Sequence, residues 1–186
     1  EKKSAKLSNR YIADILIVLK AIFRYAVKVY SISDVFSNVT MPKCPHKDIG
    51  VLTESEQKVL ISLLTASPDR NKLSVLFALF WGLRIGEICG LKWSDADFEN
   101  LVIYVKRTVQ RVKSSSGSKK TEIVVTEPKS EKSKRTIPIP AELCELLKLF
   151  KSDDDQYIIS DSKKPAEPRT IQYRYVKLLK NADLPS

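Results

Sequence analysis

Two charged side chains, Arg84 and Glu87, interrupt the most apolar part of this sequence, the stretch 73–93. The run 73–81 has the composition of a buried helix, Gly82 can end it, and helical apolar spacing then resumes. Arg84 is therefore predicted at the junction of two buried helices, with Glu87 three residues on and leaning toward the same cleft. A buried guanidinium needs an anionic partner. That partner is either Glu87, in a structural ion pair, or a phosphate.

The distribution of charge favours a polyanionic partner. The chain has 186 residues with 32 Lys and Arg against 22 Asp and Glu, a net charge of +10. Residues 1–50 carry a net +5 and residues 101–136 a net +7, whereas residues 51–100 carry −2 and residues 137–186 are neutral. Two basic segments on either side of a neutral core suit a protein that binds a polyanion from two sides. The alternative is that the lysines only solubilise loops.

Several other functional classes find no support in the sequence. No apolar run approaches the roughly 18 residues of a membrane span, and residues 1–6 do not resemble a signal peptide. Cys44, Cys89 and Cys144 lack metal-ligand spacing, and His46 is the only histidine, so no metal site is expected. Three unpaired thiols indicate a cytoplasmic protein.

The first basic segment reads as one long amphipathic helix. Ser8 is a plausible N-cap, and apolar residues follow at spacings of three and four up to Tyr30. Lys20, Arg24 and Lys28 form a basic row beside this stripe and could contact a polyanion. We therefore expect residues 1–31 to be the C-terminal part of a helical domain and residues 32–51 to be a linker.

A second domain is predicted over residues 52–186, mainly α with a small antiparallel β-meander (α+β). Thr53 and Glu56 have capping-box spacing at its first helix. Short β-branched runs at 101–106, 123–125 and 136–139 are interpreted as the three strands of the meander. Their two connections, 113–121 and 127–134, are rich in lysine. The remaining predicted elements are a helix opened by Pro140, a short strand at 157–159 and a last helix at 170–181.

Three motifs occur in this order: Leu52-Thr53-x-x-Glu56, Gly82-Leu83-Arg84-Ile85-Gly86-Glu87-Ile88-x-x-Leu91-Lys92-Trp93-x-Asp95, and Pro128-Lys129-x(5)-Arg135-Thr136-Ile137-Pro138-Ile139-Pro140. This arrangement resembles the catalytic domain of the tyrosine recombinases, the phage integrase family. The helix at 8–30 is similar to the end of that family's core-binding domain. The resemblance covers nearly the whole chain and implies the corresponding fold.

The resemblance also implies a chemistry. These enzymes cut and rejoin DNA through a 3'-phosphotyrosyl link, which conserves the phosphodiester energy, so no cofactor is expected. Arg84 matches the first catalytic arginine, which stabilises charge on the scissile phosphate. Glu87 matches the acid that supports the site. Lys129 is the predicted general acid for the 5'-oxygen leaving group, with Lys132 and Lys134 in the same loop as alternatives.

Partners follow from the same resemblance. Double-stranded DNA is the expected ligand, and a full-length protein of bacterial, phage or transposon origin is expected to act as a tetramer on it. This chain is expected to be a monomer. The side chains predicted to contact DNA are Lys20, Arg24, Lys28, Lys119, Lys120, Lys132, Lys134 and Arg135.

The family pattern continues with His-x-x-Arg and a nucleophilic tyrosine, which this sequence does not contain in the required order. Tyr157, Tyr173 and Tyr175 precede the place where His-x-x-Arg would fall, so none is predicted to be the nucleophile. The first hypothesis is therefore an integrase fragment that binds DNA but does not cleave it alone. A second is a non-catalytic duplex DNA-binding module in which Arg84 is structural. A third is a basic protein that binds RNA or an acidic partner.

Overall fold

The structure is a computed structural model that describes residues 7–45, 50–114, 120–127 and 134–185. The chain divides into two compact units, Glu1–Ile49 (unit 1) and Gly50–Ser186 (unit 2). Each unit is described by itself.

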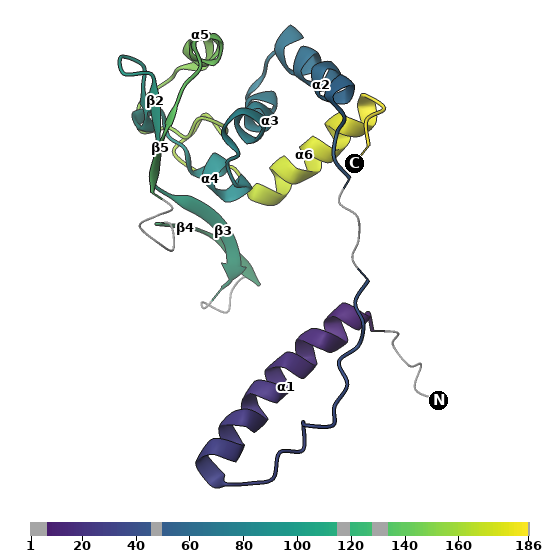
Figure 1. Ribbon diagram of the computed structural model, residues 1–186. Helices are drawn as coiled ribbons and strands as arrows, with labels where there is room; N and C mark the ends of the chain where they lie inside the picture. Colours follow the sequence, from purple (N-terminus) through teal and green to yellow (C-terminus); the bar gives the residue numbers. More distant parts are fainter. Residues whose placement is uncertain (1–6, 46–49, 115–119, 128–133, 186) are drawn as a thin grey trace. The chain divides into compact units, whose positions relative to one another are not determined.

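Unit 1 is built on one long helix, α1 (Asn9–Tyr30). Its start confirms the predicted cap, because the Tyr11 backbone N–H donates to Ser8 Oγ at 3.2 Å. The helix ends at Ser31, which adopts a left-handed φ of 53°. Residues 32–45 then run back along the helix (Figure 1), where the Phe36 ring lies 4.9 Å from the Phe23 ring.

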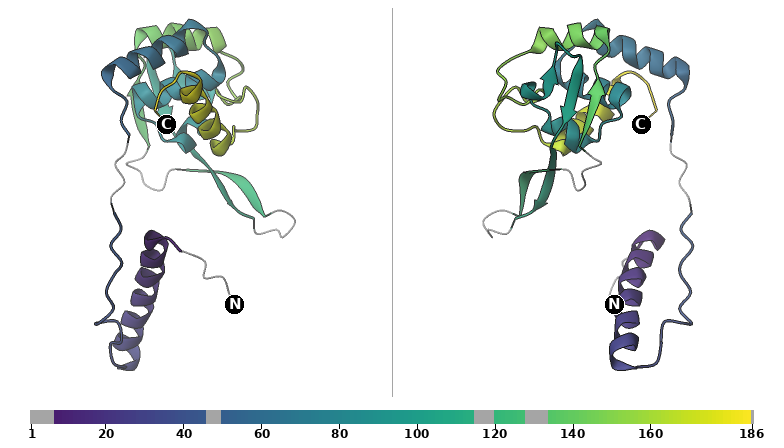
Figure 2. Two further views of the ribbon diagram at one scale, coloured as in Figure 1. Left: turned by 90° about the vertical axis from the view of Figure 1, so that its right-hand side faces the viewer. Right: turned by 60° about the vertical axis from the view of Figure 1, so that its left-hand side comes forward.

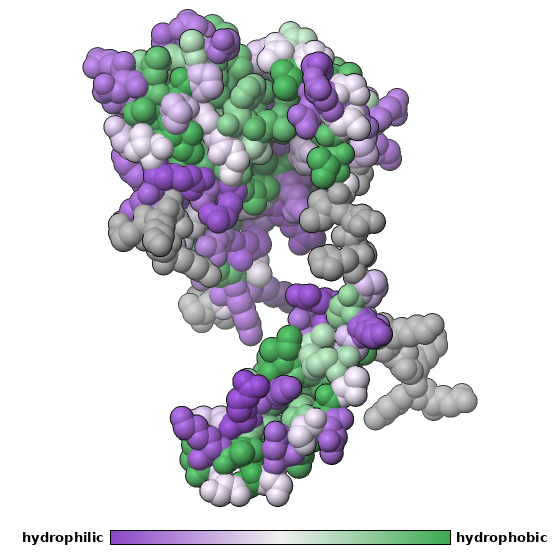
Figure 3. Space-filling view, viewed as in Figure 1, coloured by the Kyte–Doolittle hydropathy of each residue, from purple (hydrophilic) through white to green (hydrophobic). Residues whose placement is uncertain are grey.

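The apolar stripe of α1 is mostly uncovered within unit 1. Ala13 is the only buried residue of the helix. Green apolar side chains are visible on its surface in Figure 3. An apolar stripe of this length normally packs against other helices, but most of it is exposed in unit 1. The exposed apolar residues of the helix are Tyr11, Ile15, Ile17, Val18, Leu19, Ile22, Tyr25, Val29 and Tyr30.

Unit 2 packs five α-helices around a small β-structure (Figure 1). The predicted capping box at its start is confirmed: the Thr53 N–H donates to Glu56 Oε2 at 2.6 Å, and the Glu56 N–H donates to Thr53 Oγ1. The helices are α2 (Glu54–Ala66), α3 (Arg70–Trp81), α4 (Ile85–Gly90), α5 (Ala141–Phe150) and α6 (Pro168–Asn181), with a 3-10 turn at Trp93–Asp95.

The strands form two sheets. β1 (Ala96–Asp97), β2 (Val102–Val105) and β5 (Arg135–Pro138) make one antiparallel sheet in the order β1-β2-β5. β3 (Thr108–Lys113) and β4 (Thr121–Thr126) make a separate antiparallel hairpin. The hairpin projects from the rest of unit 2 (Figure 1, Figure 2). The mixed fold with small antiparallel sheets confirms the predicted fold class.

The predicted meander is wrong in its connectivity. β2 pairs with β5 and not with the run around 123–125, with Ile103 opposite Ile137 and Val105 opposite Arg135. The hairpin is inserted between these two paired strands. The strand predicted at 157–159 is also absent, since Tyr157 makes only isolated bridges to Lys92 and Ser162. The first error concerns pairing between segments that are distant in sequence, and the second concerns a short segment that the structure shows as a turn.

The core of unit 2 lies between the helices and the inner face of the β1-β2-β5 sheet. Trp81 at the end of α3 donates its Nε1–H to the Pro138 carbonyl of β5 at 3.1 Å, which joins helix and sheet. Gly82 ends α3 with a φ of 58°, a left-handed conformation that suits glycine. The largest fully buried side chains are Trp93, Phe77, Leu60, Leu64, Leu73, Leu76, Leu91, Ile103, Leu147, Ile158, Val105 and Val109.

Candidate functional site

The buried charge of the site belongs to Glu87. Only 4% of its side chain is exposed, and it lies in the first turn of α4. Glu87 Oε2 accepts a hydrogen bond from the backbone N–H of Arg84 at 3.0 Å, while Oε1 accepts one from Arg84 Nη1 at 3.1 Å. The carboxylate thus caps α4 and holds the side chain of the residue that precedes the helix.

Arg84 itself is not buried, which corrects the sequence-based expectation. Its side chain is 76% exposed, although the neighbouring Leu83 is only 5% exposed. The left-handed turn at Gly82 lies between α3 and α4, and at this junction the guanidinium extends into solvent. From the sequence, the partner of Arg84 was either Glu87 or a phosphate, and the structure shows that Glu87 contacts Arg84. The exposed guanidinium is therefore hydrogen-bonded to a buried carboxylate.

A second guanidinium completes the cluster. Arg135, the first residue of β5, donates from Nη1 to Glu87 Oε1 at 3.1 Å and from Nη2 to Glu87 Oε2 at 3.0 Å. Burial opposes ionisation of Glu87, but the hydrogen bonds from Arg135 and from the Arg84 backbone together bring its pKa below the ordinary value. Glu87 is therefore a carboxylate at neutral pH, shared by two arginines.

Helix α4 is held close to the start of the hairpin by its glycines. A Cβ atom at Gly86 would lie 2.6 Å from Thr108 Oγ1 and 2.7 Å from the Val109 carbonyl oxygen. A Cβ at Gly90 would lie 2.9 Å from the Arg107 carbonyl oxygen. Only glycine allows this approach, so these two residues fix the position of α4, and with it Glu87, against β3.

A second buried carboxylate, Asp95, makes a separate set of contacts just after the C-terminal end of α4. It is 1% exposed, pairs with Arg107 Nη1 and lies 3.5 Å from Lys106 Nζ. Its Oδ2 also accepts the Lys92 backbone N–H at 2.9 Å. This network holds the β2–β3 connection against α4. The sequence analysis placed Asp95 in a motif and assigned it no partner. The available signal for the network in the sequence was the aspartate of the Trp-x-Asp motif together with the cations at 106 and 107.

The predicted basic residues of α1 are all exposed. Lys20, Arg24 and Lys28 are spaced by one helical turn along α1. In unit 2, Lys120 is exposed beside the hairpin, and Lys134 pairs with Glu127 at 2.9 Å. Lys119, Lys129 and Lys132 lie outside the described residues.

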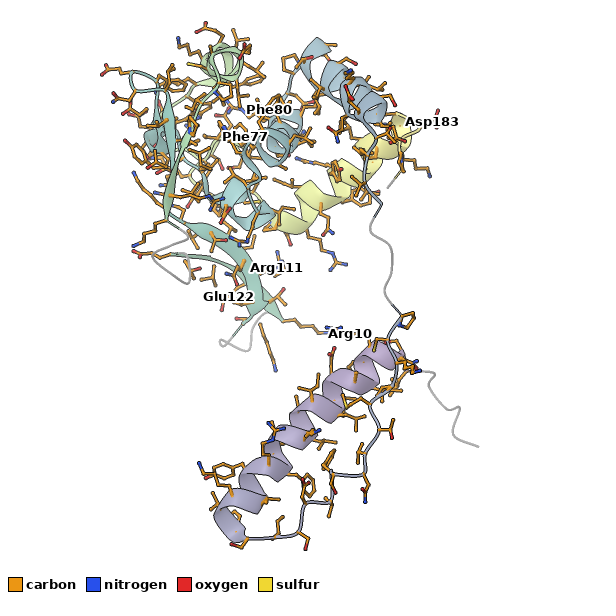
Figure 4. The ribbon with its side chains drawn as sticks, viewed as in Figure 1. Arg10, Phe77, Phe80, Arg111, Glu122 and Asp183 are labelled. Carbon is orange, nitrogen blue, oxygen red and sulfur yellow. The ribbon has the colours of Figure 1, made fainter. Side chains whose placement is uncertain are left out.

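The hairpin is tied to the last helix by an arginine that the sequence analysis did not single out. Arg111 Nε lies 2.5 Å from Glu167 Oε1, at the N-terminus of α6, and Arg111 Nη1 donates to Thr121 Oγ1 at 2.8 Å. Figure 4 shows Arg111 and Glu122 on the hairpin, and Phe77 and Phe80 on α3. Two of the charges in this basic segment are therefore structural, Arg107 and Arg111.

The three tyrosines considered as possible nucleophiles lie in different environments of unit 2. Tyr157 is buried under Lys92 Nζ, which lies 5.0 Å from its ring centroid, and Tyr173 is exposed on α6. Tyr175 lines an apolar groove together with Leu83 and Ile85. Within the described ranges, no hydrogen bond or ring contact joins a tyrosine to Arg84 or Glu87.

Among the described His, Cys, Asp and Glu side chains there is no group of three or more that could hold a metal ion; His46 lies outside the described residues. No helix in the described part of the chain is long and apolar enough to cross a membrane.

The mixed fold with its small antiparallel sheets is the fold of solved DNA integrase structures. Residues 51–185 match the sequence model of the phage integrase family. The chain belongs to the phage integrase family.

Relatives of known sequence agree with this assignment. A tyrosine recombinase XerC-like protein of Caldanaerobacter subterraneus subsp. tengcongensis is 32% identical over 137 residues, which are 70% of this chain and 35% of the relative. The tyrosine recombinase XerA of Thermococcus onnurineus is 27% identical over 89% of this chain and 52% of its own length. The chain thus spans about a third to a half of these relatives.

Solved structures show the same fold. The integrase of transposon Tn1549 in complex with a circular intermediate DNA aligns with a TM-score of 0.73 at 21% identity, covering 96% of this chain and 60% of the integrase. A lambda integrase tetramer bound to a Holliday junction aligns with a TM-score of 0.56 at 19% identity, covering 97% of this chain and 55% of that one.

Proposed function

We propose that the chain is part of a tyrosine-type site-specific recombinase of cytoplasmic, bacterial, phage or transposon origin. It binds duplex DNA and supplies Arg84 to a DNA strand cleavage and rejoining reaction that proceeds through a 3'-phosphotyrosyl intermediate. The observation that supports this most directly is the exposed guanidinium of Arg84, oriented by the buried Glu87 carboxylate within a phage integrase fold.

The chemistry of the site suits a phosphodiester. A phosphate gains negative charge on its non-bridging oxygens in the transition state, and a guanidinium already fixed in place stabilises that charge without reorganisation. The proposed roles are phosphate binding for Arg84, orientation of Arg84 for Glu87 and protonation of the 5'-oxygen for Lys129. The proposed DNA surface includes the α1 row Lys20, Arg24 and Lys28, the hairpin lysines Lys119 and Lys120, and the loop residues Lys132 and Lys134.

The domain organisation is proposed in the same terms. Residues 1–31 would be the end of a core-binding domain, 32–51 a linker and 52–186 the first part of the catalytic domain. The lambda integrase of known structure is a tetramer on a Holliday junction. We propose a tetramer on DNA for the whole protein and a monomer for these 186 residues.

Binding of the chain to a duplex of about 20 base pairs should depend strongly on salt, because phosphate contacts release counterions. Arg84→Ala is expected to reduce the slope of log Kd against log salt concentration by about one, the effect of a single lost phosphate contact. Fluorescence anisotropy titrations from low to moderate salt measure the salt dependence of binding and its change in Arg84→Ala. Lys58→Ala is the control, since Lys58 pairs with Glu54 on α2 and is not among the proposed DNA contacts. An affinity that does not change with salt would contradict DNA binding through phosphates.

The 186-residue chain is also expected not to cleave DNA by itself, since no hydrogen bond or ring contact among the described residues joins a tyrosine to Arg84 or Glu87 and the family's nucleophile follows His-x-x-Arg. The measurement uses a nicked suicide duplex, in which a cleaved strand leaves the protein covalently attached. Denaturing gel electrophoresis should show no such adduct. A covalent adduct would contradict the proposal and direct attention to Tyr157, Tyr173 and Tyr175.

One observation favours a second candidate, a DNA-binding module without chemistry. Arg84 Nη1 is paired with Glu87 Oε1 at 3.1 Å, as a purely structural arginine would be. Arg84→Ala in the full-length gene product separates the two. Loss of strand exchange with retained DNA binding supports the recombinase, and unchanged function supports the module.

A further inference from the structure

Arg135 occupies an unusual place for a charged residue. In the β2–β5 pairing, Ile137 lies opposite Ile103, and Arg135 lies opposite Val105. Residues directly opposite in an antiparallel pair share a face of the sheet, and Ile103 and Val105 are both buried. Arg135 therefore extends an inward-facing row of apolar residues, and 31% of its side chain is exposed against 76% for Arg84.

Because Arg135 points inward, both terminal nitrogens of its guanidinium reach the Glu87 carboxylate. Each carboxylate oxygen then accepts two hydrogen bonds: Oε1 from Arg84 Nη1 and Arg135 Nη1, and Oε2 from the Arg84 backbone N–H and Arg135 Nη2. A carboxylate has about four lone-pair sites, so Glu87 is fully occupied. Arg135 holds the bidentate geometry, and the Arg84 side chain holds a single contact.

The number of arginines changes the net charge of the cluster. Arg84 and Glu87 alone form a neutral pair, in which the carboxylate would offset the charge that a phosphate needs. With Arg135 included, two guanidiniums share the single carboxylate of Glu87, and Arg84 is the more exposed of the two, at 76% against 31%. The positive charge of Arg135 repels Arg84, and this repulsion offsets part of the attraction that the Glu87 carboxylate exerts on Arg84.

We propose that Arg135 is a positioning residue that acts through Glu87: by neutralising the carboxylate, it leaves the Arg84 guanidinium oriented but electrostatically available to a DNA phosphate. This proposal rests on the proposed phosphate-binding role of Arg84. It replaces the sequence-based hypothesis that Arg135 itself contacts DNA. Arg135 also follows Lys134, whose pairing with Glu127 brings the two ends of the lysine-rich connection together at the same place.

A double-mutant cycle on a 20-base-pair duplex distinguishes the two roles. Arg84→Ala and Arg135→Gln are each expected to weaken binding by about tenfold, a loss typical of one phosphate contact at low salt. If Arg135 acts through Arg84, the double variant binds no more than about twofold weaker than Arg84→Ala alone. If the two losses multiply to about a hundredfold, Arg135 contacts phosphate independently and the proposal is wrong.

A rescue experiment separates positioning from a merely structural role. Adding Glu87→Gln to Arg135→Gln removes the charge that would hold Arg84, so affinity should return to within about threefold of the wild-type chain. Glu87→Gln also restores the stability that Arg135→Gln loses, because it removes the unpaired buried charge, so affinities are compared only under conditions where both variants are fully folded. Continued loss of affinity in the Glu87→Gln/Arg135→Gln variant, with the fold intact by circular dichroism, would therefore overturn the proposal.

A second substitution covers the case in which Arg135→Gln does not fold. Arg135→Lys keeps the charge but cannot bind both carboxylate oxygens at once. Arg135→Lys is therefore expected to weaken DNA binding by only about threefold. This loss of affinity should be absent when Arg84→Ala is also present, and a loss that remains in that double variant counts against the proposal. If Arg84→Ala alone has no effect on binding, the proposed function of Arg84 fails, and the role of Arg135 fails with it.

Discussion

Replacing Glu87 by alanine is expected to lower the free energy of unfolding by about 3 kcal/mol, the low end of the range for breaking a buried ion pair. The carboxylate is 4% exposed, and its loss leaves two guanidiniums of like charge close together. It also removes the acceptor for the Arg84 backbone N–H at the start of α4. The low end applies because Arg84, at 76% exposed, can be solvated by water. Urea unfolding followed by circular dichroism measures the change.

Glu56→Ala provides a matched control. Glu56 also lies in the first turn of a helix and accepts a backbone N–H, from Thr53 at 2.6 Å, but it is only partly buried, and no arginine of the described residues pairs with it. Losing one half of a capping box costs about 1 kcal/mol. Equal losses for the two glutamates would mean that Glu87 acts only as a helix cap and that the arginine cluster contributes no stability.

The same substitution should change the acid sensitivity of the fold. The pKa of Glu87 lies below its ordinary value of 4.5, because the hydrogen bonds from Arg135 and from Arg84 outweigh the effect of burial. The unfolded chain then takes up a proton at higher pH than the folded chain does. The stabilisation by Glu87 is complete above pH about 4.5 and is lost as the pH falls through the folded-state pKa. Unfolding energies measured from pH 7 to pH 3 should fall less steeply in Glu87→Ala than in the wild-type chain.

Local signals explain which parts of the fold could be predicted. The helices α1 and α2 begin within one residue of expectation because their caps, Ser8 and Thr53, are read from adjacent residues. The pairing of β2 with β5 could not be predicted in the same way. The inserted hairpin separates the two strands, and three β-branched runs in succession are equally consistent with a meander.

The same distinction applies to the site. Arg84 and Glu87 are three residues apart, so their pairing follows from helix geometry, whereas Arg135 joins them across 48 residues. A signal for Arg135 did exist, in the alternation of Arg135, Ile137 and Ile139, which places an arginine on the apolar face of a strand. The partner of Arg135 could not be inferred from this alternation, because the sequence does not show which acidic side chain faces that strand. The exposure of Arg84 depends on the turn at Gly82 and could not be inferred from the apolar residues around it.

Gly86→Ala is the second substitution with a large expected effect, and its sign opposes helix propensity. Alanine in place of glycine inside a helix normally stabilises by roughly 1 kcal/mol. At Gly86 the new Cβ would lie 2.7 Å from the Val109 carbonyl oxygen, a backbone atom in the paired strand β3. Either α4 or the hairpin must move, so we expect a net loss of about 2 kcal/mol, within the range for overpacking a core.

The displacement should also affect DNA binding, because α4 carries Glu87 and therefore positions Arg84. We expect weaker binding of the 20-base-pair duplex by Gly86→Ala even under conditions where the protein is fully folded. Gly50→Ala is the matched control, since a Cβ there meets no atom within 4 Å. Urea unfolding and fluorescence anisotropy on the two variants separate the contributions. If Gly86→Ala were as stable as Gly50→Ala, the close packing of α4 on β3 would not be what holds the arginine cluster in place.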